Sequence, residues 1–527
     1  MAEPKQSNGG FILKAGVAKE KWALLFFMVV GAGILGLLFH FYGYLNTWHL
    51  WNIPAYTSPF LDLRSILSAA ESYAAGYDPA IANPFDPFQR NFNYPKIWYL
   101  ILAAGMNQSW TFPLGIAIVG SFLAGILVFP ERLDKLSVFL LMLGLFSSAT
   151  LLGIERGNID LFFFFLAAVG LVLLDHSIYG SFGVSMLGML FKIYPVFGVG
   201  YFLQPDDRRS YKYILAGALF TLLYLLIDLK QMLLVYENTQ KAGDWSYGVS
   251  AFPGYISYLV TKSVVQSRMP YFYTFASHLN NVFGQFPLLF YLPAFLVLIV
   301  FAGLGIRQHS FLRYDSLRNL RAFWLGAGIY IGSFFLGSNF DYRMIFLLFA
   351  IPQITFWIRD RNPGFVLAVP ATLAALFVSL WYTVIRQVAA AADPPLLWIY
   401  PFVDQAAKWS LFAGLTYLYA ASVPQWIPDD IRTLSSKLLQ WFKPHKQVGR
   451  DQSLLQAIQR WAVETGGLLH CTKTLGITSE RRLILFDSIP PRRKLSAGSM
   501  PGGRIMGLYE ARLRQSVLRS AFEGRLK

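Results

Sequence analysis

The sequence predicts an all-α polytopic membrane protein, and three observations carry this prediction. Hydrophobic residues make up 55% of the 527 positions and charged residues only 14%, too few for the charged surface of a soluble protein. Apolar runs of roughly 20 residues, long enough to cross about 30 Å of hydrocarbon, recur up to residue 423. The basic excess gathers after the last of these runs. We therefore expect a chain that crosses a bilayer many times.

The first apolar run, from about residue 22 to 42, sets the orientation of the chain. Lys14, Lys19 and Lys21 precede it, and cytoplasmic segments collect lysine and arginine. The run is too long for a signal peptide, so we expect a retained helix that follows a cytosolic segment, residues 1–21. Residues 43–95 then form a long loop on the outer face. Within this loop, "LRSILSAAESYAAG" predicts an interfacial helix.

About ten runs are predicted to be full crossings, because this number keeps the basic loops on the cytosolic side. They lie near residues 22–42, 111–129, 136–152, 159–174, 212–235, 286–306, 320–337, 343–358, 364–386 and 407–423. The region 96–129 also carries a predicted break, around "NQSWTFP".

A further run, residues 182–203, does not fit as one crossing, because it would place the basic "DDRR" on the outer face. Lys192 and Pro195 stand at its middle, in "GMLFKIYPVFGVGYFL". Proline removes a backbone donor and disfavours a helical conformation in the residue before it. We predict two half-helices that meet at "FKIYP" and return "DDRR" to the cytosol.

The chain divides into three parts by composition. The cytosolic segment 1–21 precedes a membrane domain at 22–423, and a basic cytosolic tail follows at 424–527. Residues 429–527 hold 18 lysines and arginines against 8 acidic residues, as expected beside an anionic leaflet. Within the tail, residues 431–447 predict an amphipathic helix on that leaflet. No aromatic or glycine-patterned module accompanies the basic residues, so we expect no nucleic-acid partner.

Four polar segments converge on the outer face in this topology. They are the first loop, the turn "ERGNID" (155–160), the break "KIYP" (192–195) and "SNFDYR" (338–343). Ionisable groups at the bilayer centre cost about 2.5 to 3.5 kcal/mol on insertion scales, and broken helices at membrane depth line cavities. The four segments together predict a polar site that opens to the outside.

Simpler interpretations of each segment stay open. Glu155 and Arg156 would pair in an interfacial turn, and Lys192 would extend toward the nearest polar surface. Asp341 and Arg343 would be helix-end charges. Asp62 would be the N-cap of the interfacial helix. The functional interpretation depends on all four segments sharing one face.

Several motifs resemble the family-87 glycosyltransferases of the C superfamily, which include polyprenyl-phosphate-mannose-dependent mannosyltransferases. Asp62, an alanine-rich helix, "GYDP" (76–79) and "FNYPK" (92–96) resemble their first periplasmic loop. "ERGNIDL" resembles their Arg-Gly-Gln/Asn segment, and "GMLFKIYP" their Lys-x-x-Pro break. The resemblance covers about residues 20–360. Lys96 replaces a frequent proline and Asn158 a frequent glutamine, so the substrate stays open.

The resemblance implies an inverting transfer of mannose or a similar sugar from a polyprenyl phosphate to a hydroxyl acceptor. Asp62 occupies the position of the general base. The leaving group is a lipid phosphate that gains negative charge, and Lys192 and Arg156, with Arg343, are the cations expected to bind it. The other candidates for substrate contact are Arg64, Asp78, Tyr94, Asn158, Asp160, Tyr194, Trp245 and Asp341. For Trp245 an interfacial aromatic anchor is the alternative.

We expect no cofactor. The outer loops carry no His or carboxylate cluster with ligand spacing, and a divalent cation is kept only as an alternative. The chain also lacks a glycine-rich phosphate loop, which favours a lipid-linked donor over a nucleotide sugar. The expected partners are this donor, a glycolipid or glycan acceptor and the bilayer. The expected location is a bacterial plasma membrane, with both termini cytosolic.

A transporter or flippase for a lipid-linked or anionic substrate is the alternative from another class. Secondary transporters also carry charges on broken helices, but these usually lie near the midplane between internal repeats. Here the polar motifs cluster at one face and no duplication is evident. The glycosyltransferase is therefore the favoured hypothesis.

Overall fold

The computed structural model describes residues 18–239, 245–261, 266–267, 270–309, 313–361, 365–392 and 400–442. The chain separates into two compact units, Met1–Gln440 and Trp441–Lys527, and the fold described here is that of the first. This unit extends beyond residue 423, so part of the predicted tail belongs to it. Lys14 and the tail beyond residue 442, including the end of the predicted amphipathic segment, lie outside the described residues.

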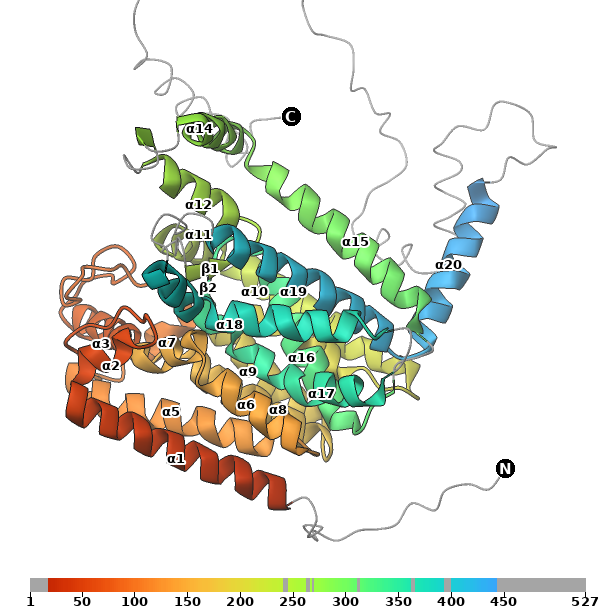
Figure 1. Ribbon diagram of the computed structural model, residues 1–527, viewed down its shortest axis with the longest axis horizontal. Coiled ribbons are helices and arrows are strands. Elements are labelled where there is room, and N and C mark those ends of the chain that lie inside the picture. Colours follow the sequence, from red (N-terminus) through yellow and green to blue (C-terminus); the bar gives the residue numbers. More distant parts are fainter. Residues whose placement is uncertain are drawn as a thin grey trace, which may run out of the picture. The chain divides into compact units, whose positions relative to one another are not determined.

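The first half of the unit is a series of helices (Figure 1). The elements are α1 (Ala18–Tyr42), α2 (Tyr44–His49), α3 (Leu61–Ala74), η1 (Lys96–Trp98), α4 (Tyr99–Leu102), η2 (Gln108–Trp110), α5 (Thr111–Val128), α6 (Lys135–Leu145), α7 (Ser148–Arg156), α8 (Asp160–Leu174), α9 (Ile178–Phe191), η3 (Tyr194–Phe202), η4 (Arg208–Ser210), α10 (Tyr211–Ile227) and α11 (Leu229–Asn238).

The second half is also mainly helical and adds two short strands. The elements are β1 (Ser246–Tyr247), α12 (Ala251–Val260), α14 (Pro270–Gln285), η6 (Pro287–Phe290), α15 (Tyr291–Arg307), α16 (Leu317–Phe334), β2 (Asn339–Phe340), η8 (Asp341–Ala350), α17 (Ile351–Asp360), α18 (Ala368–Ala392), α19 (Tyr400–Ser422) and α20 (Trp426–Phe442). The strands β1 and β2 form one short antiparallel pair in which Ser246 faces Phe340 and Tyr247 faces Asn339. This pair lies directly before η8 and joins two segments about 90 residues apart in the chain.

The predicted all-α membrane fold is confirmed at the level of its helices. Among the described residues, six helices are long and apolar enough to cross a membrane. They are Lys19–Tyr42, Gln108–Val128, Arg208–Ile227, Leu288–Arg307, Asp341–Asp360 and Ala368–Ala389. The pair α6 and α7, bent by 53°, would make a seventh span. The apolar helices α8 and α9 are shorter than a full span, and the count of ten crossings stays a prediction.

The predicted helix breaks are present. Helix α9 ends at Phe191, Lys192 is its C-cap, and the chain continues into the 3₁₀ segment η3 with Pro195 near its start. The region before α5 is likewise divided into α4, η2 and α5. Proline cannot donate the backbone hydrogen bond of a continuous helix, which explains why the 182–203 segment changes geometry at this position.

The two ends of helix α8 lie at opposite ends of the bundle. Asp160 begins this helix, and Asp175 follows its last residue, about 22 Å away at 1.5 Å per residue. At the Asp175 end, Arg318 and Arg321 pair with Asp175, Arg132 with Asp315 and Arg359 with Asp134. We call this the basic end and the Asp160 end the site end.

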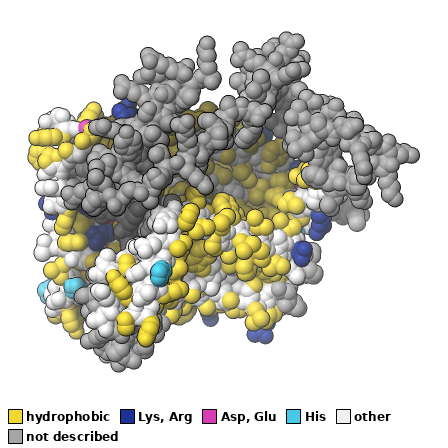
Figure 2. Space-filling view, turned by 90° about the horizontal axis from the view of Figure 1, so that it is seen from above, with side chains coloured by type: hydrophobic (Ala, Val, Ile, Leu, Met, Phe, Trp, Pro, Cys, Tyr) yellow, Lys and Arg dark blue, Asp and Glu magenta, His cyan; other side chains and the backbone are white. Residues whose placement is uncertain are grey.

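An aromatic cluster holds α5, α8 and η8 together in the core. Phe164 is fully buried and stacks on Phe349 with ring centroids 4.1 Å apart. Phe122 meets Phe164 edge-on, and Phe129 meets Phe349 in the same way. Gly125 permits this packing, because a side chain there would press on the Phe164 ring. Hydrophobic side chains also cover a broad area of the face drawn in Figure 2, as expected for a surface in contact with lipid.

We expect Phe164→Ala to lower the free energy of unfolding by about 3–5 kcal/mol, because it leaves a cavity among packed rings. The matched control is Phe26→Ala on α1, where the side chain is 62% exposed and the expected change is within about 0.5 kcal/mol. Titration of each variant in micelles with a denaturing detergent measures its free energy of unfolding. Equal losses for the two would contradict a core organised around Phe164.

Candidate active site

The position of Asp62 is set by the residue two places before it. Phe60 caps the start of α3 in the left-handed region, at φ 61°, and its N–H donates to the carbonyl of Glu155 (2.9 Å). Gly157 ends α7 with φ 56°, and a Cβ there would lie 2.7 Å from the Cβ of Phe60. Glycine is therefore required both for the backbone conformation and for the close approach. This contact brings the start of α3 against the turn before α8.

Asn158 connects Asp62 to that turn. Its side-chain N–H₂ donates to Asp62 Oδ2 (2.7 Å), and its Oδ1 accepts from the backbone N–H of Asp160 (2.9 Å). The backbone N–H can only donate, so it fixes the orientation of the amide and points the N–H₂ group at the carboxylate. A hydrogen bond from this group leaves the second oxygen of Asp62 available to another donor.

Asp160 receives two cations from distant parts of the chain. Its carboxylate is fully buried, and the Lys192 ammonium bonds to Oδ1 while Arg343 Nε lies 3.5 Å from Oδ2. Lys192 comes from the end of α9 and Arg343 from the first turn of η8. Arg343 also donates to the side-chain carbonyl of Asn339 in β2. Three helix ends and a strand thus meet at one carboxylate.

Two tyrosines pack on these cations. The Arg343 guanidinium lies 4.3 Å from the centroid of the Tyr194 ring, and the Lys192 ammonium lies 5.3 Å from that of Tyr94. Such cation–π contacts favour the charged state of both groups. Burial raises the pKa of Tyr94 well above its ordinary value, and the nearby Asp62 and Asp160 add to this effect. Tyr94 is therefore a neutral hydrogen-bond donor at any physiological pH.

Arg90 completes the surroundings of Asp62 and was missed at the level of sequence. Its Nη1 lies 3.6 Å from Asp62 Oδ1, and it bonds to Asp86 through two nitrogens and to the carbonyl of Leu61 (3.0 Å). Burial lowers the pKa of Arg90, but hydrogen bonds and attraction from Asp86 outweigh this effect and raise it overall. The sequence does contain one signal for this pair, because Arg90 stands four residues after Asp86 in a loop.

The charged side chains of the site differ in their exposure to solvent. The Asp160 side chain is fully buried, Lys192 is 12% exposed, Arg343 17% and Asp62 22%. The ammonium has three donors and the guanidinium five, and Asp160 occupies only part of them. The arrangement can therefore hold a ligand anion on the two cations while Asp62 accepts a proton beside it.

Other predicted site residues lie in neighbouring networks. Arg156 pairs with Glu155 (3.2 Å), donates to the carbonyl of Pro54 and stacks on Tyr56. Among the described residues, Arg156 forms no ion pair with Asp160, so it does not act together with Lys192 and Arg343 there. Arg64 donates to the side chain of Gln108 (2.7 Å), and Asp78 accepts from the hydroxyl of Tyr99 (2.5 Å). These two residues fasten α3 and the first loop to the region around α4 and η2.

Asp341 belongs to a second buried ionic cluster. Lys408 of α19 lies 2.8 Å from Asp341 and 2.7 Å from Asp404, and it also donates to the carbonyl of Ser246 in β1 (3.0 Å). All three ionisable side chains are buried. Trp245 packs nearby in an apolar cluster with Leu151 and Leu152 rather than in the open. The sequence singled out Asp341 but not its partners, and Lys408 was visible only as an ionisable residue at the edge of the predicted crossing 407–423.

The described residues contain no group of three or more His, Cys, Asp or Glu side chains placed to hold a metal ion. The chain matches no protein-family model, no curated protein and no solved structure.

We expect Lys408→Met to lower the free energy of unfolding by about 3–5 kcal/mol, because it leaves two buried carboxylates without their shared cation. The triple variant Lys408→Met, Asp341→Asn, Asp404→Asn removes the charges together and is expected to recover most of this loss. Thermal unfolding in detergent compares them with Lys212→Met, an exposed control on α10. A single variant as stable as that control would contradict the role of Lys408.

Proposed function

We propose that the protein is a membrane glycosyltransferase that moves a sugar from a polyprenyl-phosphate donor to a hydroxyl acceptor with inversion. One observation carries the proposal: Asp62, whose side chain is 22% exposed, is hydrogen-bonded through Asn158 to the start of α8, where Lys192 and Arg343 pair with the buried Asp160. The resemblance to family-87 enzymes covers Asp62 and the segments that carry Asp160 and Lys192, and it supports Asp62 as the general base.

In the proposed reaction, Asp62 acts as general base. The acceptor oxygen forms a bond to the anomeric carbon as its proton passes to the Asp62 carboxylate, and the bond from that carbon to the phosphate oxygen breaks. Asn158 holds one oxygen of Asp62 by a 2.7 Å hydrogen bond and so restricts its rotation. The carboxylate is thereby oriented before the acceptor binds.

Lys192 and Arg343 stabilise the leaving group in this proposal. The polyprenyl phosphate gains negative charge as its bond to the sugar breaks, and preorganised cations lower the energy of that state. Asp160 keeps both cations charged and in place without reaching the surface itself. Tyr94 and Tyr194, packed on the cations, are proposed to donate to phosphate or sugar oxygens.

The orientation proposed for the protein places the site end outside and the basic end in the cytosol. Lys19, Arg132, Arg208 and Arg359 lie at helix ends or loops that the charge rule assigns to the cytosol. This fits a donor whose phosphate faces the outer surface of a bacterial plasma membrane.

A transporter for a lipid-linked or anionic substrate is the second candidate. The buried cluster of Lys408, Asp341 and Asp404 favours it, because ionisable groups inside a membrane domain often line substrate or proton pathways. A transporter would move its substrate without forming a product.

The test is transfer of radiolabelled mannose from polyprenyl-phosphate mannose to endogenous acceptors in membranes. Asp62→Asn is expected to lower the turnover about 10²- to 10⁴-fold at equal protein level, because the amide cannot accept the proton. The matched control Asp315→Asn removes a carboxylate at the basic end and is expected to keep wild-type turnover. Equal turnover in both variants would remove Asp62 from the mechanism. Movement of an unchanged labelled lipid across the bilayer would favour the transporter instead.

The orientation has its own test in single-cysteine variants made on a Cys471→Ser background. Cysteine at Tyr77, in the first loop, is expected to react with a membrane-impermeant maleimide in intact cells. Cysteine at Arg209, beside η4, is expected to react only after permeabilisation. The reverse pattern would overturn the proposed sidedness.

A further inference from the structure

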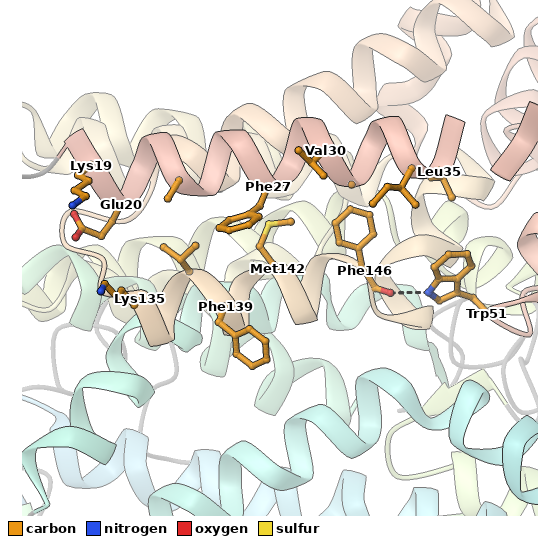
Figure 3. Close-up of a pocket in the computed structure, with 14 residues that line it drawn as sticks. Lys19, Glu20, Phe27, Val30, Leu35, Trp51, Lys135, Phe139, Met142 and Phe146 are labelled. Atoms are coloured by element: carbon orange, nitrogen blue, oxygen red, sulfur yellow. Dashed lines mark hydrogen bonds between the residues drawn. The ribbon is translucent and has the colours of Figure 1, made fainter. Parts of the chain in front are cut away.

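A long groove separates α1 from α6 on the outside of the bundle (Figure 3). Its volume is about 690 Å³, within the usual range for small-molecule sites. Apolar side chains form its walls, among them Phe27, Val30 and Ile34 of α1 and Phe139 and Met142 of α6. Several of these side chains are exposed, so the groove opens toward the lipid.

The two helices run in the same direction, which gives the groove two different ends. Lys19, Glu20 and Lys135 lie at one end, where both helices begin. At the other end, Gly31 lets the Phe146 ring contact α1, and Trp51 Nε1 donates to the carbonyl of Phe146 (3.0 Å). From Lys19 to Leu35 the helix rises about 24 Å, most of the thickness of a hydrocarbon core.

The charged end offers cations that are not already paired. Lys19 and Lys135 are exposed and form no ion pair within the described residues, while Arg132 and Arg359 close by are bound to Asp315 and Asp134. Glu20 is the acidic residue of this end, so the net charge of the three lining groups is positive. Two free ammonium groups above an apolar groove match an amphiphile with an anionic head.

The position of this end excludes the proposed sugar donor as the occupant. Lys135 follows Asp134, which pairs with Arg359 at the basic end, whereas the phosphate-binding candidates Lys192 and Arg343 surround Asp160 at the site end. A donor with its phosphate on Lys19 and Lys135 would be about a helix length from Asp62. The groove therefore suits a lipid other than the proposed donor.

We propose that the groove binds one anionic membrane phospholipid, with its phosphate between Lys19 and Lys135 and an acyl chain between α1 and α6. Helix α1 packs on the bundle mainly through α6, α2 and α5 and buries little of its own surface. An acyl chain in the groove supplies the contacts that α1 lacks along its length. The lipid therefore fastens the first helix to the rest of the domain.

The experiment titrates delipidated, full-length protein in detergent with dioleoyl phosphatidylglycerol, which is anionic, or with dioleoyl phosphatidylcholine, which has the same acyl chains and a zwitterionic head. Native mass spectrometry measures the affinity, and thermal unfolding measures the stabilisation. We expect phosphatidylglycerol to bind more tightly and to raise Tm more. Each Lys→Gln change is expected to weaken its binding about five-fold, and Lys19→Gln with Lys135→Gln about 30-fold.

Two further variants separate the groove from the surface in general. Lys212→Gln with Lys230→Gln removes the same charge from exposed positions outside the groove and is expected to leave binding unchanged. Ala23→Trp fills the groove and is expected to abolish the tight site for both lipids. Equal binding of the two lipids, equal loss in the two double variants, or a dimer that covers the groove would overturn the proposal.

Discussion

The structure of the site end depends on one constraint, which is the burial of an ionised carboxylate at Asp160. A charge at this depth is tolerated only when it is paired and hydrogen-bonded, and Lys192 and Arg343 supply the opposite charges. Neither residue is near Asp160 in the sequence, so the carboxylate joins the starts of α8 and η8 to the end of α9. The order of segments around the proposed reaction centre follows from this pairing.

Interrupted helices make that pairing feasible. Lys192 reaches Asp160 because α9 stops one residue before it and the chain turns into η3. Arg343 reaches it because the β1–β2 pair halts the chain before η8, and Lys408 holds that pair from the other side through Ser246 and Asp341. The two buried ionic clusters are thus linked through the short segment 339–343. The cluster around Lys408 therefore helps to hold Arg343 in position at Asp160.

Much of this was accessible from the sequence, and the remainder was not for identifiable reasons. Hydropathy located the apolar helices, and Pro195 located the break. The charge rule grouped Asp62, Asn158, Asp160, Lys192 and Arg343 on one side, and the structure brings these five together. Which cation pairs with which carboxylate depends on distances between helices that composition does not encode. Arg90, Asp404 and Lys408 were missed for this reason, and Arg156 and Asp341 lie in other networks than those expected. The number of crossings was hard to predict because short apolar helices and full spans have similar composition.

The contact of Phe60 with Gly157 has a consequence for how such a protein diverges. The position of Asp62 is fixed by the turn between α7 and α8, which contacts Phe60, and not by the loop that precedes α3. Insertions or deletions between α2 and Phe60 leave that anchor in place, as do substitutions on the exposed side of the loop. The surface of this loop can therefore vary in sequence while the carboxylate keeps its hydrogen bond with Asn158.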